Sequence, residues 1–227
     1  MKYFSTLDLV ALAFFILVWF GYHFVLEWTR HGHFGLNSRM NVYRDIWMTR
    51  MLERDVRIVD TQIMASLQNG TAFFASTSLF AIGGVLTLMR STDDILAVAA
   101  ALPFGIESTR ALWELKTIGL AVIFAYAFFK FSWSYRLFNY VAILIGAMPP
   151  YKDRNKPSAR LHAARTAKLC GAAGRHFNRG QRAFFFALGY LGWFISPWLF
   201  VIATLAVVIV LWRRQFLSDS VQALTHG

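Results

Sequence analysis

The sequence contains a single cysteine, Cys170, and few charged residues. One cysteine excludes an intrachain disulfide and a cysteine-based metal site. Charged side chains occupy 15% of the 227 positions, whereas soluble domains carry about 25%. The shortage falls on the acidic residues, because 12 Asp and Glu stand against 23 Lys and Arg. Since 57% of the chain is hydrophobic, the composition is typical of a membrane protein.

The sequence also lacks the motifs of common enzyme classes. It has no nucleophile elbow, P-loop or HExxH motif, so we predict no enzyme activity, no catalytic residues and no cofactor. His31 and His33 have no evident third partner, so no metal site is predicted. Haem ligation by His23 is an alternative that an absent Soret band would exclude. No recognition motif accompanies the net charge of +11, so no nucleic-acid partner is predicted.

Apolar runs approaching 20 residues recur along the chain and indicate membrane spans. We predict one all-α domain over residues 1–227, a polytopic membrane protein with four transmembrane helices plus long cytoplasmic and short interfacial helices. The predicted spans are about 7–26, 71–89, 115–136 or 115–148, and 184–212, and the predicted cytoplasmic segments are 27–60 and 150–182. The third run is about 54 Å long as a helix, so it either leaves the membrane near Arg136 or tilts steeply.

Proline and glycine interrupt two further apolar runs. Pro197 lies in the middle of the fourth predicted span. It indicates a packing kink, or a broken helix whose carbonyls face an ion. The run at 95–102 is too short to span and ends at Pro103 and Gly105. We predict an interfacial or partly re-entrant helix there.

The distribution of charge predicts an orientation. Basic residues concentrate in 27–60 and 150–182, whereas 90–116 is balanced. The positive-inside rule places both basic segments in the cytoplasm and therefore both termini outside it, in a bacterial inner membrane. Arg213 and Arg214 count against this orientation but are outnumbered.

One long helix is predicted over 57–89, polar at its start and apolar at its end. At about 100° per residue, its small and polar side chains gather within an arc of about 60°. The candidate residues on this arc are Gln62, Asn69, Ser76, Gly83 and Thr87, together with Ala65, Ala72 and Phe80. Such a face meets protein or water, so it is either a helix–helix seam or the wall of a polar pathway.

Lys130 is the best single functional candidate, because an intramembrane lysine is costly. Tyr126 and Ser134 lie one helical step of four residues before and after it. Lys130 either snorkels to the cytoplasm, lines an anion pathway with Ser134, or pairs with an acid. His23 and Glu27 share the same spacing and indicate an acid–base relay or an interfacial anchor.

A basic helix is predicted to start at Pro157–Ser158. Its cationic residues Arg160, Lys168, Arg175, Arg179 and Arg182 fall within an arc of about 100°. This face is expected to contact anionic lipid head groups. A soluble anion, a phosphate group or a partner protein is the alternative.

Several sequence features together resemble one known family. They are GYH near the end of the first span, a cytoplasmic helix with Asn, Arg and Trp, and DTQIMASLQNGTAFFASTSLFAIGG. A Leu–Lys pair at Leu115 and Lys116 and GQRAFFFALGYLGWFISP complete the set. The chain resembles the membrane family called domain of unknown function 599 over nearly its whole length. The resemblance implies a four-span protein and transfers no catalytic residue.

The function favoured by these features is a homo-oligomeric channel or transporter for a small ion, with an anion as the preferred species. The alternative is a non-catalytic structural or assembly subunit of a larger membrane complex. The expected partners are membrane lipids, including anionic head groups, and further copies of the chain.

Overall fold

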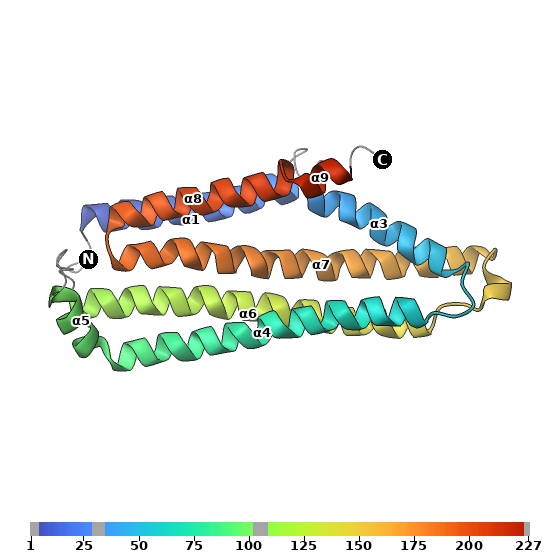
Figure 1. Ribbon diagram of the computed structural model, residues 1–227, viewed down its shortest axis with the longest axis horizontal. Coiled ribbons are helices and arrows are strands. Elements are labelled where there is room, and N and C mark those ends of the chain that lie inside the picture. Colours follow the sequence, from blue (N-terminus) through green and yellow to red (C-terminus); the bar gives the residue numbers. More distant parts are fainter. Residues whose placement is uncertain (1–4, 29–34, 102–108, 225–227) are drawn as a thin grey trace.

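The computed structural model describes residues 5–28, 35–101 and 109–224. The described chain is entirely helical, with no strand, as the sequence predicts. The helices are α1 (Thr6–Trp28), α3 (Leu36–Met51), α4 (Ile58–Arg90), α5 (Thr92–Ala101), α6 (Arg110–Gly146), α7 (Pro157–Leu191), α8 (Pro197–Phe216) and α9 (Asp219–Ala223). Short 3-10 turns at Tyr151–Asp153 (η1) and Gly192–Phe194 (η2) precede α7 and α8. Figure 1 shows an elongated bundle with its long helices side by side.

Four of the described helices are long and apolar enough to cross a membrane. They are Thr6–Glu27, Ile58–Arg90, Arg110–Gly146 and Pro197–Ala223. The first three contain the predicted spans, and the 37 residues of α6 run without a break. At 1.5 Å per residue α6 is about 55 Å long, which exceeds a hydrocarbon core of about 30 Å, so the helix either leaves the membrane near Arg136 or tilts, as the sequence predicts.

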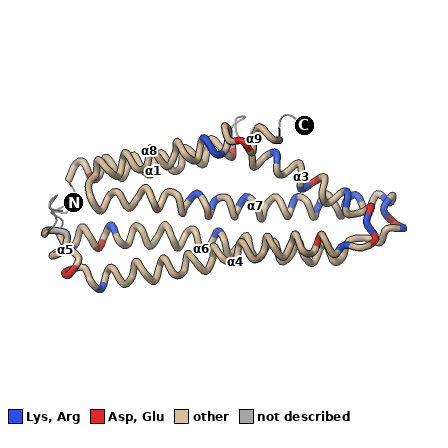
Figure 2. Tube along the Cα trace, in the orientation of Figure 1, with Lys and Arg blue, Asp and Glu red and all other residues tan. Residues whose placement is uncertain are grey.

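The bundle has an apolar half and a basic half. Figure 2 shows that Lys and Arg gather where α3, α4, α6 and α7 extend together beyond α1 and α8. We call this the basic half, and we call the opposite end, where α1 and α8 begin, the Pro197 end. The predicted long helical extensions are therefore present. The predicted interfacial helix is α5, which lies at the Pro197 end (Figure 1).

The predicted fourth span, 184–212, is wrong as one continuous helix. The chain ends α7 at Leu191, passes through η2 and starts α8 at Pro197. Ser196 is extended (φ −160°, ψ 155°) and its hydroxyl caps α8 by accepting from the Leu199 N–H. Proline at the first helical position favours a new helix start over a kink. α7 and α8 consequently form an antiparallel hairpin (Figure 1).

Two glycines make the hairpin possible. A Cβ on Gly192 would lie 2.9 Å from the carbonyl oxygen of Leu199, and one on Gly189 would lie 3.3 Å from the Cα of Thr204. Backbone therefore approaches backbone at both places, as small residues allow in membrane helices. These contacts are visible only in the structure. The sequence alone does not distinguish a kink at Pro197 from a reversal of the chain.

The reversal changes where the chain ends. α8 starts beside α1 at the Pro197 end, where the rings of Phe200 and Phe15 pack at a tilt of 37° with their centroids 5.0 Å apart. It finishes toward the basic half, where Asn37 donates to Gln215 across 3.2 Å. The start of α1 and the end of α9 lie at opposite ends of the apolar half (Figure 1). The prediction that both termini lie outside the cytoplasm rested on one uninterrupted fourth span, which this fold does not contain.

Two cores hold the bundle together. The apolar half has an aromatic core that contains Phe15, Phe131, Phe186, Tyr190, Trp193 and Phe200. The basic half has a core of methionines, small residues of α7 and larger apolar side chains of α6, and it contains Met48, Met51, Met64, Phe138, Val141, Ala163, Ala167, Cys170 and Ala173. In lipid, close packing replaces the hydrophobic effect as the main attraction between helices. The pairing of large rings with α7 glycines, such as Phe131 against Gly180, follows from that constraint.

Replacing Gly192 by Ala should destabilise the α7–α8 hairpin, because the new Cβ meets backbone atoms of Leu199. We expect a loss of roughly 1–3 kcal/mol, measured as thermal unfolding in detergent. Gly84→Ala is the control, since nothing lies within 4 Å of its Cβ position, and it should leave stability unchanged or raise it by up to about 1 kcal/mol. Equal melting of Gly192→Ala and wild type would contradict the tight reversal.

Candidate functional site

A cluster of charged side chains joins α1, α6 and α7 where the apolar half meets the basic half. The carboxylate of Glu27 lies at its centre. The Nε of Arg179 donates to Glu27 Oε1 at 2.8 Å, and a second Arg179 nitrogen contacts Oε2. Arg182 Nη2 donates to Oε1 at 2.9 Å, and His23 Nε2 lies 3.4 Å from Oε2. The predicted i, i+4 contact of His23 and Glu27 is therefore present, with two arginines added.

Lys130 reaches this cluster from α6. Its Nζ lies 5.0 Å above the ring of Tyr126, the residue that the helical spacing places beside it. Within the described residues no carboxylate oxygen lies within 4.0 Å of this Nζ. Of the three alternatives for Lys130, the pair with an acid is therefore not formed. A cation–π contact holds the ammonium instead.

His176 lies one helical turn before Arg179, and its neighbours include the cations Lys130 and Arg175. Its buried Nδ1 has no hydrogen-bond partner among the described residues. The cluster thus holds three cationic side chains, those of Lys130, Arg179 and Arg182, against one carboxylate.

Ser134 serves packing and does not line a pathway. Its fully buried hydroxyl donates to the carbonyl of Ala173 at 2.8 Å and ties α6 to α7. Ser134 and Lys130 therefore have different roles although the spacing placed them together.

A second charged group lies at the Pro197 end and was not predicted. Asp8 accepts from the indole Nε1 of Trp193 at 2.7 Å. Lys116 donates to the Trp193 carbonyl at 2.8 Å, with its Nζ 3.7 Å from Asp8. Both charged residues are 5% exposed. Their polar groups are satisfied by one another, so this group is a structural clamp. No sequence spacing links its three members, which come from α1, α6 and η2.

Aromatic rings fill the space between the two charged groups. Trp19 stacks on Phe186 with centroids 4.9 Å apart, and Phe15 meets Phe186 edge-on at 5.7 Å. Tyr190 and Phe200 continue this packing toward Trp193. The interior along α1 and α7 is therefore a packed core rather than an aqueous passage.

The polar stripe of α4 faces outward. All five predicted residues, Gln62, Asn69, Ser76, Gly83 and Thr87, are exposed. The opposite face, with Met64, Thr71, Ser78 and Val85, is the buried one. Nothing lies within 4 Å of a Cβ position on Gly83. The stripe is not a helix seam inside the described chain, and it is free to meet lipid or another chain.

The five basic residues predicted to share one face of α7 separate into two groups. Arg160, Lys168 and Arg175 are exposed. Arg179 and Arg182 turn toward Glu27 and have side chains that are 25% and 14% exposed. The helical period alone places all five residues on one face of α7. It cannot show that α1 packs against one end of that face and partly buries Arg179 and Arg182.

The predicted absence of a metal site concerns His31 and His33, which lie outside the described residues. Within the described part of the chain, no group of three His, Cys, Asp or Glu side chains could hold a metal ion. Cys170 is buried, and burial raises the pKa of its thiol.

Comparison with known proteins gives one match. A family model described as "Protein of unknown function, DUF599" matches residues 10–220. No curated protein and no solved structure matches the chain. The resemblance found in the sequence is confirmed over nearly the whole length.

Glu27→Gln should destabilise the protein, because it leaves two arginines without a carboxylate at a partly buried position. Hydrogen bonds to charged groups contribute roughly 1.5–3 kcal/mol, and we expect a loss of that order in thermal unfolding. Glu114→Gln is the matched control, since Glu114 makes a more exposed pair with Arg110 and should cost less than about 1 kcal/mol. Similar losses of stability for both variants would show that Glu27 contributes no more to folding than an exposed ion pair does.

Proposed function

Because this chain belongs to the DUF599 family, whose description assigns no function, we propose from its own geometry that it is a homo-oligomeric membrane channel or transporter for a small anion. The single observation that carries the proposal is Lys130, which has no carboxylate within 4.0 Å among the described residues and lies in a cluster with Arg179 and Arg182.

The electrostatics of the cluster favour an anion. Glu27 offsets one of the three cationic side chains and leaves two positive charges at partly buried positions. Uncompensated charge in a membrane helix is costly, and a bound anion would relieve that cost. The basic half beyond the cluster raises the local concentration of anions. The buried Nδ1 of His176 has no hydrogen-bond partner among the described residues, so it offers a hydrogen-bonding group at the same place.

The proposed orientation follows the positive-inside rule. The basic half lies in the cytoplasm of a bacterial cell, and the Pro197 end lies on the opposite side of the inner membrane. Arg213 and Arg214, at the end of α8, then also lie on the cytoplasmic side, as the rule favours. The apolar end of α7 runs back through the membrane beside α1, so the N-terminus lies outside and the C-terminus inside.

The α4 stripe supports an oligomer. The aromatic core fills the interior of one chain, so a pathway has to use a surface that two chains share. Asn69, Ser76 and Thr87 are exposed polar groups on a membrane helix, and small and polar residues are what membrane helices place at their contacts.

A second candidate function is a non-catalytic assembly subunit of a larger membrane complex. The same exposed stripe favours it, because a different membrane protein could cover Asn69, Ser76 and Gly83 as well as a second copy could. Mild-detergent purification separates the two candidates, since only the assembly role requires a different protein bound at fixed stoichiometry.

Lys130→Gln should lower anion flux by about tenfold, the effect of losing one charge-assisted interaction. The measurement is uptake of iodide, nitrate, phosphate and acetate into proteoliposomes. Lys152→Gln is the control, because Lys152 is an exposed lysine near the far end of the basic half, and its flux should match wild type. Wild-type flux no greater than that of empty liposomes, or equal flux in both variants, would overturn the proposal.

Ser76→Trp should reduce self-association, because a large ring replaces a small polar group in the exposed stripe. The measurement is the mass of the protein in native nanodiscs, where the wild type should contain more than one chain. Leu17→Trp is the control, since Leu17 is 72% exposed on α1 and lies off the stripe. A single-chain wild type would contradict the oligomer.

A further inference from the structure

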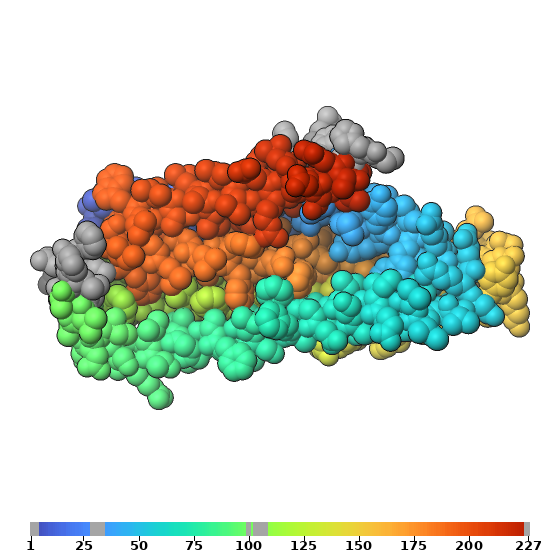
Figure 3. All heavy atoms as spheres, in the orientation of Figure 1, coloured from blue at the N-terminus to red at the C-terminus, as the bar shows by residue number. Residues whose placement is uncertain are grey.

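A second feature lies on the other side of α7. Figure 3 shows α7, in orange, uncovered between α8, in red, and α4, in green, along one face of the molecule. Three adjoining pockets occupy this hollow, with empty volumes of about 510, 640 and 730 Å³ that include open space. The first two share Gln181, Phe185 and Arg214. The last two share Asn37 and Asn178. We call this continuous hollow the lateral groove.

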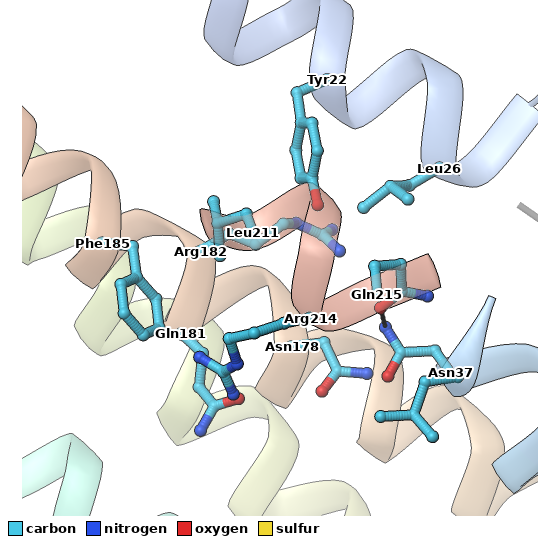
Figure 4. Close-up of a pocket in the computed structure, with 11 residues that line it drawn as sticks. Tyr22, Leu26, Asn37, Asn178, Gln181, Arg182, Phe185, Leu211, Arg214 and Gln215 are labelled. Carbon is cyan, nitrogen blue, oxygen red and sulfur yellow. Dashed lines mark hydrogen bonds between the residues drawn. The ribbon is translucent and has the colours of Figure 1, made fainter. Parts of the chain in front are cut away.

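The middle of the lateral groove is polar and cationic. Figure 4 shows the arginines Arg182 and Arg214 with the amides of Asn178, Gln181 and Gln215 around the same opening. Arg44 adds a further cation toward the basic half. None of the residues that line the three pockets is acidic. The lining is therefore complementary to a negative group.

Several of these polar groups have hydrogen-bonding capacity to spare. Within the described residues, the side chains of Asn178 and Gln181 make no hydrogen bond to protein. Arg214 has no carboxylate within 4.0 Å there and lies 5.0 Å above the ring of Phe185. An arginine beside free amides is a common arrangement for a phosphate oxygen.

The groove becomes apolar toward the Pro197 end. There it is lined by Phe74, Phe184, Phe185 and Leu188, with Gln181 and Arg214 at its edge. Asn178, Gln181, Phe185 and Leu188 fall within an arc of about 80° on α7. Along this face, the amide side chains of Asn178 and Gln181 are followed by the apolar side chains of Phe185 and Leu188.

The length of that face matches one leaflet of a bilayer. Asn178 and Leu188 are ten residues apart, about 15 Å along the helix, which is half of a hydrocarbon core of about 30 Å. The polar part lies beside Arg182, which bonds Glu27 near the end of α1, where the first membrane helix finishes. A head group at this level has its acyl chains directed toward Leu188.

We propose that the lateral groove binds one anionic phospholipid from the leaflet at the basic half. Its phosphate lies among Arg214, Asn178 and Gln181, and one acyl chain follows Phe185 to Leu188. A soluble phosphate would use the polar groups but leave the apolar part unfilled. A bound apolar helix would cover the hydrocarbon part but leave Arg214 and the amides without partners. A phospholipid satisfies both parts.

This site is separate from the proposed anion pathway. Lys130 lies near Glu27 and His176 and lines none of the three pockets. Arg182 touches both sites, so it is unsuitable for a test. Lys130→Gln should leave lipid binding unchanged, which separates failure of this proposal from failure of the transport function.

Delipidated protein should bind phosphatidylglycerol in preference to phosphatidylcholine with the same acyl chains. The measurement is native mass spectrometry of the full chain during lipid titration. Arg214→Gln should weaken phosphatidylglycerol binding by about fivefold, the effect of one cation near a membrane surface. Arg213→Gln is the matched control, because the neighbouring arginine lines none of these pockets, and its binding should match wild type.

The acyl chain is tested separately. Leu188→Trp should reduce the bound lipid by filling the groove, whereas Leu191→Trp, on an exposed residue of α7 outside the groove, should not. An unchanged melting temperature confirms that each variant folds. If Leu188→Trp does not fold, Gln181→Leu takes its place and should reduce lipid binding to the same extent. Equal binding of both lipids, equal losses for Arg213→Gln and Arg214→Gln, or equally tight binding of glycerol 3-phosphate would overturn the proposal.

Discussion

The hydrogen bonds at Trp193 are the interaction on which the rest of the structure depends. A chain that reverses within an apolar region leaves carbonyl groups that the next helical turn does not satisfy. Lys116 donates to the Trp193 carbonyl at 2.8 Å, and the Trp193 indole donates to Asp8 at 2.7 Å. One residue of the turn is thereby fixed to both α1 and α6. Because the turn is fixed, α8 runs alongside α1, and α8 supplies one wall of the lateral groove.

α7 is the element that the Lys130 cluster and the lateral groove share, and different faces of this helix contribute to each. Gly180, Ala183 and Ala187 are buried and let α6 and the aromatic rings approach closely. Arg179 turns toward Glu27 on one side, and Gln181 opens into the groove on another. The predictions from the sequence divided this helix between a basic segment, 150–182, and the start of the fourth predicted span, because its first half is basic and its second half is apolar. Hydropathy averaged over a window cannot show that two such different halves form one helix.

The sequence predicted correctly those features that depend on the residues of a single helix. The three long apolar helices α1, α4 and α6, the all-helical class and the family follow from local hydropathy and motifs, and the residues of the α4 stripe share one exposed face as the helical period requires. It did not predict the features that depend on how two helices pack against each other. Pro197 was interpreted as a kink or a break within one span, since only the approach of Leu199 to Gly192 shows a reversal. Asp8 and Lys116 are more than a hundred positions apart, so only the fold brings them together.

The distribution of the basic residues suggests why this chain carries so many more cations than anions. Residues such as Arg160 and Lys168 are exposed along the basic half, where their charges add to one positive field. Arg182 and Arg214 lie where the long helices enter the apolar half, and there a cation needs a specific partner because water is scarce. Glu27 is the partner of Arg182. Arg214 has none of that kind among the described residues and faces hydrocarbon on one side and free amides on the other. A cation in that position is stable when the membrane itself provides the counter-charge, so the charge imbalance of the sequence and the open groove of the structure have one physical explanation.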